Sequence, residues 1–193
     1  MTRRRERNRH LRVTILAVGF MLWLGGSATA VSIITRTDIT PFYSLSEVMT
    51  AKRDGGLATE VYGGPSESVT AAAITAPLRL PARVGGGRLI PVPPDSEAVP
   101  AIRMVLLFNA AYLDARTACR DPAAAGASRQ DGGLNVFAVL CHGGRYFSQA
   151  HLRDGSVSGV SDPGYAASMM QLFLALMPSR DEVDRDSGDH GRD

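Results

Sequence analysis

Two segments of the chain are apolar at almost every position over the length of a β-strand. Residues 101–108 read Ala-Ile-Arg-Met-Val-Leu-Leu-Phe, and residues 134–141 read Leu-Asn-Val-Phe-Ala-Val-Leu-Cys. Successive side chains of a strand point to opposite faces of the sheet, so a strand that is apolar throughout has both faces covered. We therefore predict that these two segments are the central strands of a sheet.

A third strand is predicted directly after the second. The sequence His142-Gly143-Gly144-Arg145 suits a tight hairpin turn, because glycine accepts a positive φ. Residues 145–152 then alternate, and we expect one face to be exposed to water. One face would carry Tyr146, Ser148, Ala150 and Leu152, and the exposed face Arg145, Phe147, Gln149 and His151.

Apolar residues recur at helical spacing in residues 163–177. Asp162 can cap this helix, and Pro163 suits its first position. Fifteen residues give a helix of about 22 Å, which is too short to cross the hydrocarbon core of a bilayer. We predict that this helix packs across the sheet.

Weaker patterns predict four further elements. Ser44 and Glu47 form a capping box, with Tyr43 and Val48 placed as a hydrophobic staple. The other three are a strand at residues 57–62, a loose hairpin at the sheet edge at residues 78–92, and a helix at residues 109–120. Prolines 81 and 91 cannot donate to a ladder, which is why we expect the hairpin at an edge.

Together these elements predict an α+β fold, with an antiparallel sheet packed against a C-terminal helix. We expect residues 57–178 to form this domain and residues 35–56 to be a tether that contains the short capped helix. Residues 179–193 carry six acidic and three basic side chains and almost no apolar ones. Such a composition predicts a disordered acidic tail.

Residues 1–34 combine a cationic head, an apolar run and a small-residue site. Six arginines precede Val13, and residues 13–34 carry no charge. In one interpretation the run is the apolar part of a signal peptide that is cleaved after Ala30, at Ala28-Thr29-Ala30. In the other, residues 13–34 remain as an anchor helix long enough to cross a bilayer, with the arginines in the cytoplasm. Both interpretations predict a periplasmic domain, either released or anchored in the inner membrane.

The net charge changes once this head is set aside. The whole chain has a formal charge of +2, but residues 1–30 hold six Arg and one Glu. The rest therefore has 15 basic and 18 acidic residues and is about −3. A nucleic-acid-binding domain needs a basic patch on the folded part, so we expect no nucleic-acid partner.

The chain has two cysteines, Cys119 and Cys141. Outside the cytoplasm such a pair favours a disulfide bond. The alternative, a metal or haem site that uses Cys141 and His142, lacks ligands, because a structural zinc site takes four and a catalytic one takes three. We therefore predict a structural disulfide and no bound metal or cofactor.

No catalytic motif is present. Ser161 lies in Gly-Val-Ser-Asp-Pro-Gly, which lacks the glycine spacing of a serine-hydrolase elbow. Among the histidines, His142 in the predicted turn and His151 on the predicted exposed face are the two candidates for a functional role, and we expect both to be solvated.

These observations predict an exported accessory or binding protein without catalytic activity, whose partner is a membrane protein complex. Two alternatives stay open: a small periplasmic hydrolase with an unrecognised site, and a metal- or haem-handling protein that uses Cys141 and His142. The oligomeric state is left undetermined by the sequence.

Overall fold

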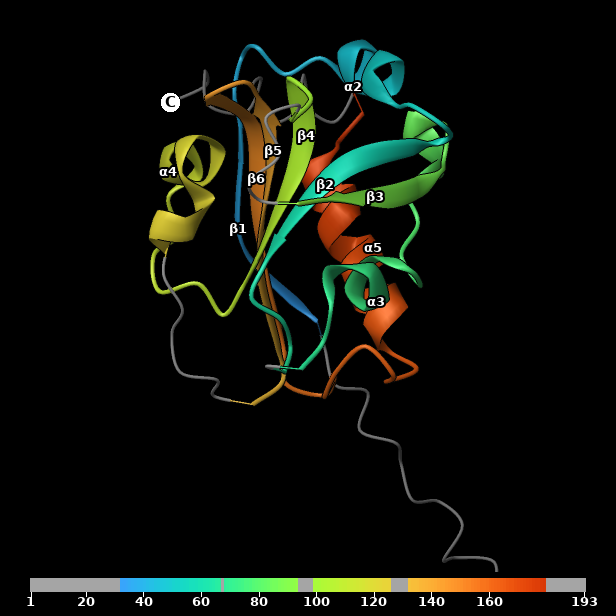
Figure 1. Ribbon diagram of the computed structural model, residues 1–193, viewed down its shortest axis with the longest axis vertical. Coiled ribbons are helices and arrows are strands. Elements are labelled where there is room, and N and C mark those ends of the chain that lie inside the picture. Colours follow the sequence, from blue (N-terminus) through green and yellow to red (C-terminus); the bar gives the residue numbers. More distant parts are fainter. Residues whose placement is uncertain (1–31, 67, 94–98, 126–131, 180–193) are drawn as a thin grey trace, which may run out of the picture.

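The computed structural model describes residues 32–66, 68–93, 99–125 and 132–179. These residues form one six-stranded sheet in the order β1-β6-β5-β4-β2-β3 (Figure 1). The strands are β1 (Ile33–Ile39), β2 (Gly56–Tyr62), β3 (Arg88–Val92), β4 (Ile102–Phe108), β5 (Leu134–His142) and β6 (Arg145–Asp154). The helices are α2 (Leu45–Ala51), α3 (Ala71–Thr75), α4 (Ala115–Arg120) and α5 (Tyr165–Leu176), with short 3₁₀ turns η1 (Ala82–Val84) and η2 (Pro122–Ala125). The predicted signal or anchor and nearly all of the predicted tail lie outside the described residues.

The α+β class with a C-terminal helix on the sheet is confirmed, but the sheet is mixed. The antiparallel prediction was correct for β4, β5 and β6, and the unpredicted strand β1 also pairs antiparallel to β6. It was wrong for β2 and β3, because β2 runs parallel to both β3 and β4. Helix α3 and η1 carry the chain back along the sheet, so that Arg88 begins β3 beside Gly56 at the start of β2. Only the single bridge between Arg79 and Arg88 remains of the expected hairpin.

The sheet separates two layers of helix. Helices α3 and α5 lie on one side of the sheet and α4 lies on the other (Figure 1). On the α5 side, the larger hydrophobic cluster combines the sheet with Val48 of α2, Ile74 of α3, and Tyr165 and Phe173 of α5. On the α4 side, a smaller cluster contains Val105, Leu107, Ala115, Ala118, Cys119, Ala125, Phe137, Val139 and Cys141.

The two central strands are confirmed. Strands β4 and β5 are neighbours in the middle of the sheet, and their apolar side chains are buried on both faces. The alternation follows the sequence prediction, since Met104 and Leu106 belong to the larger cluster and Val105 and Leu107 to the smaller one. Burial on both faces explains why the sequence of each strand is almost wholly apolar.

The exposed face that we predicted for β6 is absent, because side chains from Phe147 to Leu152 are all buried. Helix α4 packs against the face of β6 that carries Gln149 and His151. A β-bulge also changes the faces: Ser148 pairs with Leu140 and Tyr146 with Cys141, which leaves Phe147 as the extra residue. Phe147 consequently joins the larger cluster.

Residues 35–39 belong to the sheet and are not a tether. Strand β1 pairs with β6 along its whole length, from Ile33 beside Arg153 to Ile39 beside Ser148. Most side chains of this strand are exposed. Its backbone nevertheless closes one edge of the sheet, so the folded unit begins at least as early as Ser32.

Helix boundaries follow the capping residues. Ser44 caps α2 as predicted, by accepting a hydrogen bond from the amide of Glu47. Helix α4 starts six residues later than expected, because the side chain of Asp114 caps it at Thr117. The prediction that Asp162 caps the C-terminal helix was wrong, because α5 starts at Tyr165 with Gly164 as its N-cap and no side-chain cap. The Asp162 carboxylate accepts from the amide of Gly164 in the turn before the helix. Within the described ranges, no helix is both long and apolar enough to cross a membrane.

Candidate functional site

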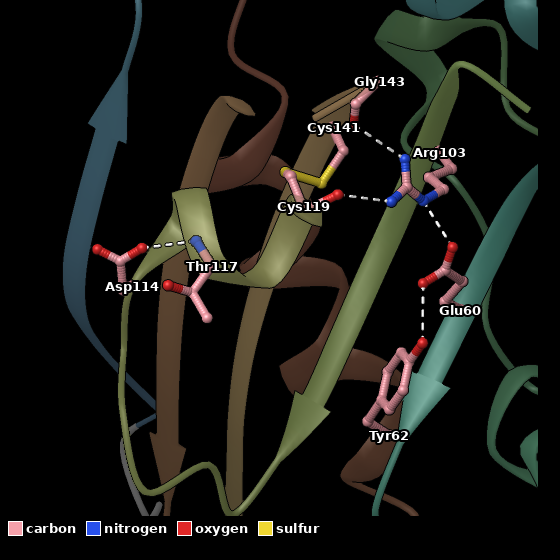
Figure 2. The surroundings of a disulfide bond; sticks show 8 residues. All are labelled: Glu60, Tyr62, Arg103, Asp114, Thr117, Cys119, Cys141 and Gly143. Carbon is pink, nitrogen blue, oxygen red and sulfur yellow. Dashed lines mark hydrogen bonds and ion pairs between the residues drawn. A yellow bond between two sulfur atoms is a disulfide. The ribbon is translucent and has the colours of Figure 1, made fainter. Parts of the chain in front are cut away.

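The predicted disulfide is present between Cys119 at the end of α4 and Cys141 near the end of β5 (Figure 2). Both cysteines are almost fully buried in the smaller cluster. The bond closes a loop across 22 positions and attaches the last turn of α4 to the sheet. It thereby fixes the position of the Cys119 carbonyl, which accepts a hydrogen bond from Arg103 of β4.

A buried ion pair lies beside the disulfide. Arg103 of β4 donates from Nε to Glu60 Oε1 of β2 at 2.6 Å, and their side chains are 10% and 3% exposed. The hydroxyl of Tyr62 donates to the other oxygen of Glu60 at 3.2 Å. Figure 2 shows the three side chains in a row across β2 and β4. Because both oxygens of Glu60 have partners, this charge is well compensated inside the protein.

The guanidinium group of Arg103 also binds two backbone carbonyls. Its Nη2 donates to the carbonyl of Cys119 at 2.8 Å and its Nη1 to the carbonyl of Gly143 at 3.1 Å. Arg103 therefore connects β2, the end of α4 and the β5–β6 turn (Figure 2). The planar fork of arginine suits this task, since its five N–H donors point in fixed directions.

A hollow of about 450 Å³ opens above this cluster. It lies where the ends of β2, β4 and α4 meet the β5–β6 turn. Its lining residues are Glu60, Tyr62, Val99, Pro100, Ala101, Arg103, Cys119, Arg120, Pro122, Gly143 and Gly144. The hollow thus has an ion pair at its base, one aromatic hydroxyl, and the exposed Arg120 at its rim.

The hollow presents three kinds of chemical group. Tyr62 presents an apolar ring, Arg120 presents a cation, and the turn presents backbone groups of Gly143 and Gly144. The side chains of Arg103 and Glu60 are engaged with each other. Such a combination of apolar surface, charge and backbone polar groups is typical of sites that bind small molecules.

The structure separates the two candidate histidines from this hollow. His142 ends β5, and its Nδ1 lies 3.7 Å from Glu47 Oε2, with both side chains partly exposed. Its ring also meets the ring of Phe147 edge to face. The adjacent Cys141 is in the disulfide, so its sulfur is not a thiolate ligand in this state.

His151 was expected on an exposed face, and that expectation was wrong, because its exposed fraction is 5%. Its Nε2 lies 2.7 Å from Asn135 Oδ1, and its Nδ1 lies 2.7 Å from the hydroxyl of Thr35. Nε2 donates to the Asn135 oxygen, so the neutral ring accepts from Thr35 at Nδ1. Burial, together with the charges of Arg153 and Arg36, lowers the pKa of His151 to about 4. The residue joins β1, β6 and β5 as a neutral hydrogen-bonding group.

Asp154 is the centre of another polar cluster, at the opposite end of β6. The hydroxyls of Ser32, Ser168 and Ser156 all donate to its carboxylate at 2.5–2.6 Å. Burial raises the pKa of Asp154, but these hydrogen bonds outweigh it and lower the pKa to about 2. The three serine hydroxyls thus donate to an ionised carboxylate. Among the described residues, the hydrogen-bond and ion-pair partners of His142 and His151 are instead Glu47, Thr35 and Asn135.

The disulfide was predicted from the sequence, whereas the ion pair between Arg103 and Glu60 was not. A signal for the pair was present, since Arg103 is the one charge in the apolar run of residues 101–108. A charge in a strand covered on both faces requires a partner. The identity of that partner was hidden, because Glu60 lies 43 positions away in a strand whose parallel pairing was not foreseen.

Comparisons with known proteins found no matching family model, no similar curated protein and no similar solved structure. Across the described ranges, no group of three or more His, Cys, Asp or Glu side chains is arranged to hold a metal ion.

Proposed function

We propose that this protein is an exported accessory domain, anchored in the inner membrane by its N-terminal segment, that binds a partner through the hollow beside the disulfide. The partner belongs to a membrane protein complex of the cell envelope. The proposal includes no catalytic step.

The observation that carries the proposal is the position of the hollow relative to the start of the folded unit. Ser32 is attached to Asp154 at one end of β6. The hollow includes Gly143 and Gly144, which precede the other end of β6. Ten residues of strand separate these ends by about 30 Å. Strand β1 starts at the end of β6 that is opposite to the β5–β6 turn (Figure 1). In a protein anchored through residues before Ser32, the hollow beside that turn would therefore face away from the bilayer.

Two further features support this proposal. The buried disulfide is compatible with an oxidising compartment such as the periplasm. Residues 33 and 34 lie in β1, so an anchor helix would end before them. Residues 13–31 still provide 19 uncharged positions, or about 28 Å of helix, which is close to the thickness of a bilayer core.

Location is tested first, with the intact mass and membrane partition of the native protein under non-reducing conditions. We expect the full-length mass, less two hydrogens for the disulfide, in the membrane fraction. We also expect alkaline phosphatase fused after Ser179 to be active, because that enzyme needs an oxidising compartment. An inactive fusion, or a soluble protein that starts at Val31, would contradict the anchored form.

Binding is tested by chemical cross-linking in intact cells and purification of the cross-linked complex. Arg120→Glu on the rim of the hollow should abolish a specific cross-linked species, since it reverses the charge that faces the partner. Arg116→Glu is the matched control, because this residue lies on the same helix outside the hollow. Equal cross-linking of both variants would show that the hollow is not the binding site.

A further inference from the structure

A second hollow lies at the β3 edge of the sheet, where the loop after α2 meets the chain between α3 and β3. Its volume is about 640 Å³. Arg79 and Arg88 both line it, together with Thr75, Gly87 and Asp54. None of these residues belongs to the hollow beside the disulfide.

The two arginines are held opposite each other. Arg79 and Arg88 form an isolated antiparallel bridge, which places directly opposed side chains on the same face with about 5 Å between their Cβ atoms. Both side chains are exposed. Like charges that face each other across two strands repel, so this arrangement is unfavourable unless an anion is present.

No carboxylate neutralises this pair within the described residues, where the ion pairs are Arg103–Glu60 and His142–Glu47. Arg79 donates from Nη1 to the carbonyls of Ala76 and Leu78 at 2.8 and 2.7 Å. Arg88 makes one long contact of 3.5 Å from Nη2 to the carbonyl of Asp54. Each guanidinium group has five N–H donors, so most of them remain available to a ligand.

The backbone around the pair is fixed. The amide of Arg88 donates to the carbonyl of Gly55 at 3.1 Å, and the amide of Leu80 donates to the carbonyl of Gly87 at 2.9 Å. Gly87 has φ +114°, and a Cβ there would come within 2.5 Å of the Gly55 carbonyl oxygen. Only glycine permits this close approach, which fixes the Arg88 segment against the loop after α2. The bond between Leu80 and Gly87 joins the Arg79 and Arg88 segments, so the two are held together before a ligand arrives.

From this geometry we infer that the hollow binds an anionic group, a phosphate or a carboxylate of a small molecule, between Arg79 and Arg88. Guanidinium groups bind such oxyanions through two parallel hydrogen bonds each, and the anion removes the repulsion between the two cations. Asp54 is the one carboxylate among the lining residues, and it opposes the anion and limits the affinity. The site is independent of the proposed partner-binding hollow.

Calorimetric titration of the full chain in detergent tests this inference. The probes are sodium phosphate and sodium succinate, each at constant ionic strength maintained with sodium chloride. We expect saturable binding of at least one probe, and the probe that binds identifies a phosphate or a carboxylate as the preferred group. Arg79→Gln/Arg88→Gln should weaken binding about tenfold or more, because two charged hydrogen-bonding groups are lost.

The matched control is Arg116→Gln/Arg153→Gln, which removes the same charge from exposed positions away from the hollow. It should bind the probe as the unchanged protein does. The inference is overturned if neither probe binds, or if the two double variants bind equally. Near-ultraviolet circular dichroism checks that each variant is folded.

A second double variant tests the same inference if the glutamine variant fails to fold. Arg79→Lys/Arg88→Lys keeps both charges and loses the planar fork, so it should bind the probe more weakly than the unchanged protein. Unchanged affinity in the lysine variant would contradict bidentate binding by these two residues.

Discussion

Arg103 illustrates how a single charged side chain becomes part of a sheet interior. It is flanked by apolar residues in sequence, yet its side chain is buried and has Glu60 and two carbonyls as partners. The desolvation cost of a buried ion pair is often as large as its attraction. The pair therefore contributes to the geometry of the hollow more than to stability.

This balance leads to a prediction for residue substitutions. Arg103→Met should lower the free energy of unfolding by about 3–5 kcal/mol, because Glu60 is left as a buried charge without a partner. Arg103→Met/Glu60→Leu should recover most of this loss, since both charges are removed. Urea unfolding of the two variants measures the difference. A double variant as unstable as the single one would contradict this account.

His151 predicts a pH dependence of stability. Its pKa is about 4 in the folded state and 6.5 in the unfolded state, so the unfolded chain binds more protons between these values. Stability from this group is therefore complete above pH 6.5, falls as the pH decreases toward 4, and is constant below. The loss amounts to as much as about 3 kcal/mol. Urea unfolding at several pH values measures it.

Substitution of each histidine separates this effect from others. His151→Gln should remove the slope between pH 6.5 and 4, while His142→Gln should retain it, because it leaves the buried His151 in place. Asp154 acts in a lower range, since its pKa falls from 3.8 to about 2 in the folded state. Its stabilisation is present above about pH 4 and is lost as the pH falls toward 2. A slope that persists in His151→Gln would mean that another group titrates.

At the scale of elements, helix α4 depends on a covalent bond. It has six residues, which is too short for a helix to persist by itself in water. Three contacts hold it: the cap by Asp114, the disulfide at Cys119, and the bond from Arg103 to the Cys119 carbonyl. The hollow is bounded by this helix, so its shape depends on the same contacts.

Removal of the disulfide should therefore loosen α4. Cys119→Ala/Cys141→Ala should lower the free energy of unfolding by about 3 kcal/mol, as the chain-entropy model gives for a loop of this size. Amide hydrogen exchange should become faster in α4. The amides of α5 should keep the same ranking of exchange rates among themselves. Unchanged protection at Ala118 would show that packing alone holds the helix.

At the scale of the whole molecule, β1 decides where the folded unit begins. Strand β1 pairs with β6, and the hydroxyl of its residue Thr35 is a hydrogen-bond partner of His151. The strand lies directly after the segment that we propose as an anchor. Any pull on that segment would therefore act on the edge of the sheet.

Truncation tests this boundary. A chain that begins at Ser32 should fold with nearly the thermal midpoint of the full protein. A chain that begins at Thr40 should be unfolded or much less stable, because it loses the whole ladder between β1 and β6. Thermal unfolding followed by circular dichroism distinguishes the two. A stable chain from Thr40 would show that the fold does not require β1.

The sequence alone determined those elements whose stability comes from their own pattern. The apolar runs of β4 and β5, the capped helix α2, the spacing in α5 and the cysteine pair could all be read directly, because each signal lies within one segment. The edge strand β1, the parallel pairs of β2, the bulge at Phe147 and the burial of His151 depended on which segments meet in space. Only the tertiary structure decided these, and with them the Arg103–Glu60 pair and both hollows. Their free energy comes from contacts between residues far apart in sequence, which no local pattern encodes.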